Sequence, residues 1–239
     1  FEILKTKGLL SGNRRILHIA PEACLATILR SRFGSNYLCG DRDAAQFAFP
    51  GVVKLDLCHD LAQLDAASFD IVLHNHVLEH VACDYQGVAT ALHRLVRPGG
   101  LHIFSIPFMD GGFRETLDAQ TDEHRTAHFG QWDHMRIFSP GDLQQTLGAV
   151  LSLPTDYDAT RLAPAERLLA INVPEAAWHG FNNNTVFVLE KAAAAPLMER
   201  AASEKQEEDI VAPLPASRPP AILFVSANGI GQGHLTRQL

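Results

Sequence analysis

The 239-residue chain is 46% apolar and 20% charged, a composition typical of a globular protein that buries a full core. Its formal net charge of −7 and pI near 5.9 argue against a general nucleic-acid binder, because no basic stripe is present to neutralise phosphates. No run approaches the length of a membrane helix and no signal-peptide pattern is visible, so we expect a cytoplasmic protein without a membrane span.

The first sixty residues predict strands that alternate with helices and turns. Residues 1–13 predict a short helix, and residues 15–20 (R-I-L-H-I-A) predict the first strand. Pro21 suits the first turn of the next helix, where its missing N–H costs nothing, and Leu25, Ile28 and Leu29 fit one apolar face of that helix. Residues 36–39 and 52–55 predict the second and third strands, and an aspartate follows each of them, Asp41 and Asp56.

The sequence S-F-D-I-V-L-H-N-H-V-L-E-H-V at 68–81 changes character in its middle. Residues 69–73 form the apolar, β-branched run of a strand covered on both faces, and His74, Asn75 and His76 then end it with polar side chains. Residues 84–97 predict a helix, and P-G-G at 98–100 predicts a tight turn into a fifth strand at 101–106. This alternation indicates a parallel, doubly wound sheet, whose ligands lie at the carboxyl ends of the strands.

Residues 107–136 form a polar, irregular connection that carries several aromatic side chains, and a long connection of this kind inside a domain is usually functional. S-P-G-D at 139–142 predicts a helix start that continues through 143–147. Residues 150–153 and 185–189 predict the closing strands. Residues 157–182 between them predict an insertion over the site.

Two stretches, F-D-I-V-L-H-N-H-V-L-E-H-V and L-H-R-L-V-R-P-G-G-L-H-I-F-S-I-P, resemble the fourth and fifth strands of class I S-adenosylmethionine-dependent methyltransferases, in the type 11-like group whose fourth strand leads into L-E-H. The resemblance extends over about residues 14–191. It implies an α/β fold with a doubly wound, mostly parallel seven-stranded sheet and an antiparallel last strand. The glycine-rich first turn of that family is replaced here by H-I-A-P-E-A-C.

The resemblance also implies where S-adenosylmethionine would bind. Asp41, about twenty residues beyond the first turn, suits the two ribose hydroxyls, although an aspartate there can also be a helix N-cap. Asp56 and Leu57 match the position that meets the adenine. The full expected cofactor set is Ala20, Pro21, Asp41, Asp56, Leu57, Asn75 and His76.

The segment at 107–136 predicts the acceptor site. His134 is the expected general base and Asp133 its expected partner, because a neutral imidazole takes up a hydroxyl proton near pH 7. His128, Trp132 and Arg136 are the expected acceptor contacts, with Phe129 and Trp132 as flat surfaces and Arg136 for an anionic group. The alternative is that Asp133, His134 and Arg136 only pin the segment to the domain.

Two residue types raise other possibilities. His74, His76 and His80 make an H-x-H-x-x-x-H pattern similar to that of metallo-β-lactamase-like hydrolases, but the aspartate of that motif is missing and we predict no metal. Cys24, Cys39, Cys58 and Cys83 form no C-x-x-C pair, so we expect four free thiols in a reducing compartment.

The C-terminal part differs in composition from the rest. Residues 1–191 predict the methyltransferase domain, and residues 192–220, with an alanine run and P-L-P-A-S-R-P-P, predict a solvated linker. Residues 221–239 resemble the start of a two-lobed nucleotide-sugar glycosyltransferase, in which a glycine-rich turn follows a strand. Since the chain begins without methionine and stops within this motif, we expect a fragment of a fusion protein.

The predicted activity is methyl transfer from S-adenosylmethionine to an oxygen or nitrogen of a small acceptor, a sugar or glycoconjugate given the neighbouring domain. Two alternatives stay open at this point. One is a non-catalytic domain that keeps the fold and positions the fused glycosyltransferase, and the other is a metal-dependent hydrolase. Fold alone decides none of these.

Overall fold

The computed structural model describes residues 1–192. The predicted linker beyond Ala192 and the glycosyltransferase-like start at 221–239 lie outside these residues. The helices and strands of the described part are α1 (Glu2–Thr6), β1 (Ile16–Ile19), α2 (Ala23–Phe33), β2 (Tyr37–Asp41), β3 (Val52–Lys54), β4 (Phe69–Asn75), α3 (Tyr85–Leu95), β5 (Val96–Ser105), β6 (Arg114–Glu115), α4 (Asp122–Phe129), β7 (Arg136–Ile137), α5 (Ala165–Ala170) and β8 (Phe187–Glu190).

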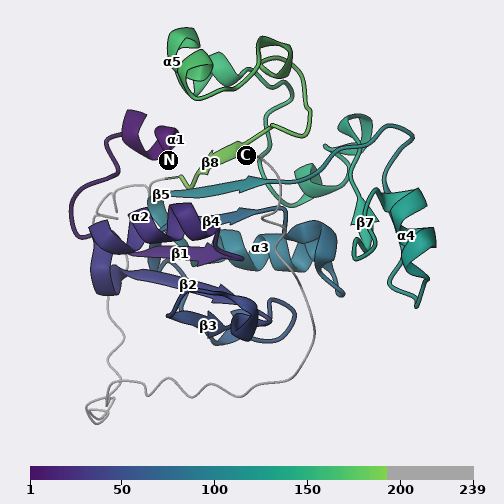
Figure 1. Ribbon diagram of the computed structural model, residues 1–239, viewed down its shortest axis with the longest axis horizontal. Coiled ribbons are helices and arrows are strands. Elements are labelled where there is room, and N and C mark those ends of the chain that lie inside the picture. The colour runs from purple at the N-terminus through teal and green to yellow at the C-terminus, as the bar shows by residue number, and fades with distance from the viewer. Residues whose placement is uncertain (193–239) are drawn as a thin grey trace, which may run out of the picture.

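One six-stranded sheet organises these elements, in the order β3-β2-β1-β4-β5-β8 (Figure 1). The strands β1 to β5 run parallel, and β8 pairs antiparallel with β5. The order reverses direction between β1 and β4, which is where an open α/β sheet places its ligand. The predicted fold class is confirmed: the sheet is mostly parallel, doubly wound and closed by an antiparallel edge strand, as in the Rossmann-like methyltransferase fold.

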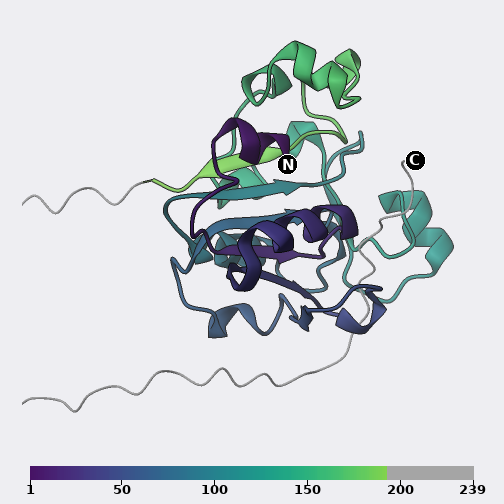
Figure 2. The same cartoon turned by 60° about the vertical axis from the view of Figure 1, so that its left-hand side comes forward.

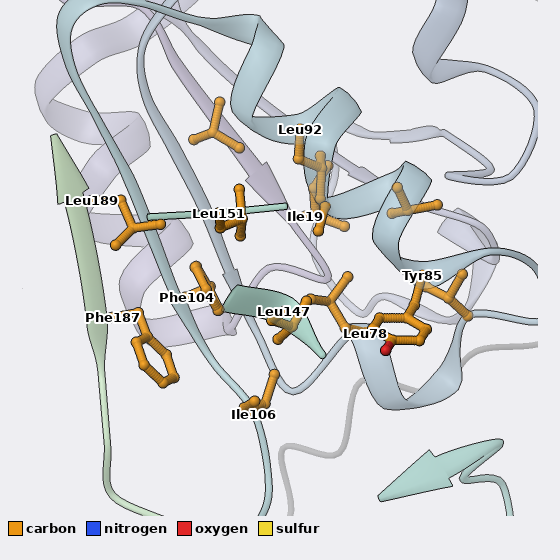
Figure 3. Close-up of a cluster of buried hydrophobic side chains, with 14 of the residues drawn as sticks. Ile19, Leu78, Tyr85, Leu92, Phe104, Ile106, Leu147, Leu151, Phe187 and Leu189 are labelled. Carbon is orange, nitrogen blue, oxygen red and sulfur yellow. The ribbon is translucent and has the colours of Figure 1, made fainter. Parts of the chain in front are cut away.

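Both faces of the sheet are covered, which explains why the central strands β1 and β4 are buried at successive positions rather than at every second one. On one face, α1 and α2 bury Leu4, Leu29 and Phe33 against side chains of β1, β2, β4 and β5. On the other face, α3 and residues 143–151 form the larger cluster shown in Figure 3. The predicted core positions of α3, namely Val88, Leu92 and Leu95, are all buried there.

The start of β5 shows why P-G-G follows α3. Gly99 has a φ of +74°, a conformation that side chains other than glycine rarely adopt. A Cβ on Gly100 would lie 2.6 Å from the carbonyl oxygen of Asp70 in β4, so a side chain does not fit there. The two glycines therefore allow β5 to approach β4 directly after the helix.

The predicted strand at 150–153 is wrong, and the described sheet has six strands rather than seven. Its backbone is bonded within local turns instead: Leu151 N donates to Leu147 O over 2.9 Å, and Leu153 N donates to Leu151 O over 2.8 Å. Pro154 follows and has no N–H for a ladder. The buried side chains of Leu147 and Leu151 contact the core from these turns (Figure 3).

The predicted helix at 139–147 forms only short 3-10 turns, Pro140–Asp142 and Leu147–Ala149. Ser139 makes no side-chain cap hydrogen bond. Thr146 has a ψ of −98°, and its hydroxyl donates to the carbonyl of Asp142 over 2.8 Å. This ψ is far from the helical value, so the chain leaves the helical path at Thr146.

The expectations for α2 need two corrections. Pro21 precedes the helix, because Glu22 is the N-cap residue and the helix begins at Ala23. Ile28 does not belong to the apolar face, since its side chain is exposed, and the buried residues are Ala26, Leu29 and Phe33.

None of the helices in the described part of the chain is long and apolar enough to cross a membrane.

Residues 157–182 do not cover the carboxyl ends of the strands, contrary to the prediction. They lie beyond β8, at the edge of the sheet opposite β3, as both views show (Figures 1 and 2). They have their own small apolar cluster around Tyr157, Leu168 and Trp178. Arg167 fastens this segment to α1 through two contacts with the Glu2 carboxylate, 2.5 and 2.6 Å long.

Candidate functional site

A pocket lies at the carboxyl ends of β1, β2, β3 and β4, where the strand order reverses. Its walls come from the four segments that end or follow these strands, and the lining residues are Ile19, Ala20, Asp41, Arg42, Leu55, Asp56, Leu57, Cys58, His76, Val77, His80, Val81 and Ala82. Carboxylates from two strand ends therefore lie beside apolar side chains from the neighbouring ends. This combination suits a flat apolar ring that carries hydroxyl groups.

Two of the lining residues have backbone conformations that side chains other than glycine seldom adopt. Ala20, directly after β1, has a φ of 48°, and His76, directly after β4, has a φ of 50°. Such positive φ angles cost of order 1 to 3 kcal/mol in residues other than glycine and cluster at binding sites, although Ala67 and Asn172 also adopt them away from the pocket. Ala20 thus adopts the left-handed conformation that is typical of glycine, so the turn after β1 forms without a glycine.

Asp41 ends β2 with its side chain almost fully buried in the pocket wall. Its Oδ1 accepts a hydrogen bond from the backbone N–H of Asp43 over 2.7 Å. Burial raises the pKa of the Asp41 carboxyl to about 6, although the Asp43 N–H and the Arg42 and His80 side chains oppose this shift. The N-cap alternative is not supported, because the 3-10 turn that follows begins after Asp43 and has no side-chain cap.

Asp56 and Leu57 follow β3 and also line the pocket, as expected. Asp56 Oδ1 accepts from the backbone N–H of Cys58 over 2.8 Å, and its Oδ2 lies 3.3 Å from Nδ1 of the exposed His59. These contacts fix the loop so that the Asp56 side chain stays at the pocket wall.

Pro21 and Asn75 do not line the pocket, contrary to expectation. Asn75 Nδ2 donates to Glu22 Oε1 over 2.8 Å, and Asn75 Oδ1 accepts from the Ser105 hydroxyl over 3.1 Å. The other Glu22 oxygen lies 2.7 Å from Nε2 of the buried His18. The side-chain amide of Asn75 is therefore used to tie β4 to β5 and to the first turn.

Glu22 is a residue whose role the sequence reasoning missed. It lies in the A-P-E turn. Burial alone would raise the pKa of its carboxyl, but the contacts with His18 and Asn75 hold this pKa below the usual range. By joining β1, β4 and the start of α2, Glu22 fixes the turn that contains Ala20. The sequence did contain a signal for this role, because the acidic Glu22 stands in a turn that is glycine-rich in the resembled family.

Cys58 and Cys83 form a disulfide that joins the loop after β3 to the loop before α3. The prediction of four free thiols is therefore wrong for these two residues, while Cys24 and Cys39 are free. Spacing along the chain did not reveal the pair, because the two loops meet only in the folded protein. The reducing compartment inferred from free thiols loses this support, and the cytoplasmic location stays a prediction.

We expect the disulfide to contribute strongly to stability. The linked cysteines are 25 residues apart, and closing a loop of that size in the unfolded chain is worth about 3 kcal/mol. Cys83→Ser should lower the free energy of unfolding in urea by about that amount, and Cys24→Ser, at an exposed free thiol, should leave it unchanged. Thiol titration of the unreduced, denatured protein should find two reactive groups; four would contradict the pairing.

Arg136 is not available for an acceptor, contrary to expectation. Its side chain is 0% exposed, and its Nε donates to Glu115 Oε1 over 2.6 Å. Its two Nη atoms donate to the carbonyls of Leu78 and Cys83, and the guanidinium lies 5.0 Å from the Tyr85 ring centre. Arg136 therefore pins β7 to the loop after β4, which is the alternative role considered for it.

The other predicted acceptor contacts lie on or near α4, beyond the carboxyl ends of the strands (Figure 1). Phe129 is buried and offers no open surface, whereas Trp132 is 40% exposed. His128 stacks on His124, and its Nδ1 bonds to the His124 carbonyl over 2.9 Å. Neither His128 nor Trp132 is among the residues that line the pocket.

His134 and Asp133 are near the pocket but are not partners of each other. Asp133 Oδ2 lies 3.3 Å from Nδ1 of His80, and the ring of His134 lies edge-on to the His80 ring, with centroids 4.8 Å apart. Burial lowers the pKa of the His134 imidazole. Of these residues, His80 reaches the pocket wall, and the sequence reasoning did not include it among the cofactor or acceptor residues.

His74 belongs to the core rather than to a site. It is fully buried, its Nε2 lies 2.9 Å from Nε2 of His102, and its ring stacks on Phe104. Burial lowers the pKa of His74 to about 3, so it is neutral at physiological pH. The H-x-H-x-x-x-H pattern therefore does not describe one set of ligands.

Comparison with known proteins gives a family match over part of the chain. Residues 22–104, from the N-cap of α2 to β5, match the model of the family described as methyltransferase domain. This segment contains most of the pocket-lining residues. No match was found among curated proteins.

Solved structures with a similar chain trace include three methyltransferases. An S-adenosylmethionine-dependent methyltransferase from Mesorhizobium loti is 16% identical, with 77% of this chain and 93% of that chain covered and a TM-score of 0.45. 1,6-Didemethyltoxoflavin-N1-methyltransferase from Burkholderia thailandensis is 18% identical, with 80% of this chain and 78% of that chain covered and a TM-score of 0.45. Phosphoethanolamine N-methyltransferase 2 from Haemonchus contortus is 18% identical, with 70% of this chain covered and a TM-score of 0.42. The match covers 41% of that chain, so this chain spans less than half of its length.

Proposed function

We propose that this domain binds S-adenosylmethionine in the pocket at the carboxyl ends of β1 to β4 and transfers its methyl group to an oxygen or nitrogen of a small acceptor. The observation that carries the proposal is the convergence of Asp41 and Asp56 on one pocket at the switch point of the sheet. The match of residues 22–104 to a methyltransferase domain supports it independently of this geometry.

The pocket residues fit the cofactor in their chemistry. Asp41 provides carboxylate oxygens for the ribose hydroxyls, and Asp56 provides an acceptor for the amino group of the adenine. Apolar side chains complete the wall for the flat purine, namely Ile19, Leu55, Leu57, Val77 and Val81. The turn at Ala20, with its positive φ, brings backbone rather than side chain toward the rest of the cofactor.

The cofactor supplies a methyl group that its sulfonium already activates. The protein's task is then mainly to align the acceptor with that methyl group and to exclude water. The acceptor side of the site is assigned to the His80, Asp133 and His134 group beside the pocket, with a base needed only for a hydroxyl acceptor. The assignment of His134 as that base and Asp133 as its helper stays a prediction.

The class of acceptor is a narrower proposal. A sugar or glycoconjugate is supported by the resemblance of residues 221–239 to the start of a glycosyltransferase, a sequence observation outside the described residues. If that resemblance holds, methyl transfer and glycosyl transfer would act on related molecules. Comparing glycan and non-glycan acceptors in a methyl-transfer assay with the longer chain tests this narrower claim.

Alanine variants of the two carboxylates test the cofactor site. Asp41→Ala removes a charge-assisted hydrogen-bond acceptor from a buried position, which is worth roughly 1.5 to 3 kcal/mol, or about a 10- to 150-fold loss of cofactor affinity. Asp56→Ala should weaken binding in the same direction. Isothermal titration with S-adenosylmethionine measures both effects.

Asp156→Ala is the matched control, because this aspartate is 62% exposed in the segment beyond β8. Its cofactor affinity should equal that of the wild type. If Asp41→Ala and Asp56→Ala also bind with wild-type affinity, the pocket is not the adenosine site.

Cofactor affinity should also depend on pH through Asp41. The cofactor's hydroxyls donate to the ionised carboxylate, so binding should be strongest above the free-protein pKa of about 6. Below pH 6 a proton must leave before binding, and affinity should fall by up to about tenfold per pH unit. The stability of the cofactor-free protein should depend on pH in the opposite direction. Because the folded protein raises the pKa of Asp41 from about 4 to about 6, the free energy of unfolding should decrease as pH rises through this range.

Titrations at pH 5, 6 and 7 measure this dependence. In Asp41→Asn the amide cannot ionise, so the remaining affinity should be weaker and nearly constant over this range. Arg42, Asp43 and His80 face Asp41, and any dependence that persists in Asp41→Asn belongs to His80 or to another group. An unchanged pH profile in Asp41→Asn would contradict the role of Asp41.

A further inference from the structure

Three side chains with metal-ligand chemistry converge beside the pocket. Glu79 and His80 come from the 3-10 turn after β4, and His134 comes from the connection between α4 and β7. One potential ligand atom of each lies within 4.8 Å of those of the other two. Of the three, Glu79 is 0% exposed and His134 is 7% exposed, so the group lies inside the protein.

The Glu79 carboxylate has an unusual environment. Both of its oxygens are buried. Oε1 has an ion-pair contact with Nδ1 of His76 over 3.2 Å, and Oε2 makes no hydrogen bond. A buried carboxylate normally accepts several hydrogen bonds or contacts a cation, because an ionised group without partners is costly to bury. Its surroundings are histidines that can themselves bind a cation.

The two histidines have the orientation that metal-binding histidines usually show. His134 Nδ1 lies 2.8 Å from the carbonyl of Phe129, and because a carbonyl only accepts, the proton is on Nδ1 and the lone pair on Nε2. Nδ1 of His80 faces the Asp133 carboxylate at 3.3 Å, which leaves Nε2 of His80 for a ligand. A carbonyl or carboxylate behind each imidazole fixes its tautomer and direction in metal sites.

We propose that Glu79, His80 and His134 form a binding site for a divalent transition-metal ion of the zinc class. Two imidazoles and one carboxylate suit zinc rather than magnesium, which prefers oxygen ligands. Three protein ligands leave a coordination position open, which is the arrangement of catalytic rather than structural zinc sites. This replaces the sequence-based prediction of no metal, and it uses a different set of residues from the H-x-H-x-x-x-H pattern.

The site also has a position that relates it to the pocket. His80 is both a proposed ligand and a pocket-lining residue, so the ion would lie one side chain away from the cofactor. Resting on the proposed function, the open position would hold an oxygen of the acceptor next to the methyl group. This favours acceptors with a hydroxyl or another oxygen that can coordinate a metal.

Zinc binding to the chelator-stripped full chain tests the site directly. Isothermal titration and elemental analysis after gel filtration should find one equivalent of zinc in the wild type and none of magnesium. Glu79→Gln and His134→Ala should lose more than the roughly 10- to 100-fold in affinity that removing a supporting partner costs, and Asp133→Asn should lose about that amount. His179→Ala, at an exposed histidine beyond β8, should bind zinc like the wild type.

Two further readouts keep the test decisive if a variant folds poorly. Zinc should raise the wild-type melting temperature by mass action and leave that of Glu79→Gln unchanged, whatever its starting value. Cobalt(II) should give the intense visible absorption of a low-symmetry, four- or five-coordinate ion in the wild type and not in His134→Ala.

The alternative is that these residues form only buried ion pairs, as His76 with Glu79 and His80 with Asp133. In that case zinc would not bind, or would bind equally well to His134→Ala, and either result overturns the proposal. A cofactor titration with and without chelator separates this outcome from failure of the methyltransferase assignment. Binding of S-adenosylmethionine by zinc-free protein would leave the proposed function standing even if no zinc site exists.

Discussion

Arg136→Ala should lower the free energy of unfolding by about 3 kcal/mol, because it removes one partner of a buried ion pair. The substitution leaves the carbonyls of Leu78 and Cys83 without their guanidinium donor and frees the Glu115 carboxylate. Glu115 is partly exposed, so water can solvate its carboxylate once the arginine is removed. The expected loss in the free energy of unfolding is therefore at the lower end of the range for buried ion pairs. Urea unfolding followed by far-ultraviolet circular dichroism measures the change.

Arg161→Ala provides the comparison, because Arg161 pairs with Asp156 on the surface and both side chains are 62% exposed. Exposed pairs contribute about 0.2 to 1 kcal/mol, so this variant should unfold almost like the wild type. The outcome also decides between the two roles considered for Arg136. If Arg136→Ala keeps wild-type stability and only raises KM for an anionic acceptor, the arginine binds substrate after all.

His134→Ala should lower turnover on an identified acceptor by about 10²- to 10⁴-fold while leaving cofactor affinity nearly unchanged. The reason is that His134 lies beside His80, on the side proposed for the acceptor, and is absent from the pocket wall proposed to receive the adenosine. Single-turnover kinetics with saturating cofactor measure the chemical step. His179→Ala is the matched control and should react at the wild-type rate.

Metal content separates the two ways in which His134 would act. A general base can be lost without changing the zinc content of the protein, whereas loss of a ligand removes zinc and activity together. Wild-type turnover in His134→Ala would exclude both roles. Parallel losses of stability and activity in His134→Ala, with no change in zinc affinity, would instead show a purely structural role.

The sequence predicted the parts of the fold that depend on local pattern. The apolar run that ends at His74 and the aspartates Asp41 and Asp56 mark strand ends, and such ends in a parallel sheet meet at one edge. The spacing of apolar residues in α3 also follows a local rule. The helix begins one residue later than predicted, because Asp84 caps it by accepting from the backbone N–H of Gln86. These features need no knowledge of distant contacts.

The parts that could not be predicted depend on which distant residues meet. Arg136 was expected to hold an anionic group of the acceptor, but Glu115 and two carbonyls from other segments already bind its guanidinium. Cys58 and Cys83 pair only because two loops meet beside the pocket. Residues 150–153 have the composition of a strand, yet Pro154 and local turns determine their backbone.

Glu79 is a site candidate that the sequence analysis overlooked. The L-E-H sequence served to indicate a family, and its carboxylate was not considered as a site residue. A charged residue between Leu78 and Val81, both buried, is itself a signal, because an ionised group in an apolar context requires partners. His134, which we propose as a ligand of the same ion, lies 55 positions further along the chain, and only the structure brings the two residues together.

The structure of a complex with S-adenosylhomocysteine would test the central claim most directly. We predict difference density for the nucleoside in the pocket at the ends of β1 to β4, with its ribose hydroxyls on the Asp41 carboxylate and its adenine next to Asp56 and Leu57. The sulfur should lie toward His76 and His80, on the side of the proposed acceptor site. Saturated crystals without density in this pocket, or with the nucleoside bound elsewhere on the domain, would contradict the account.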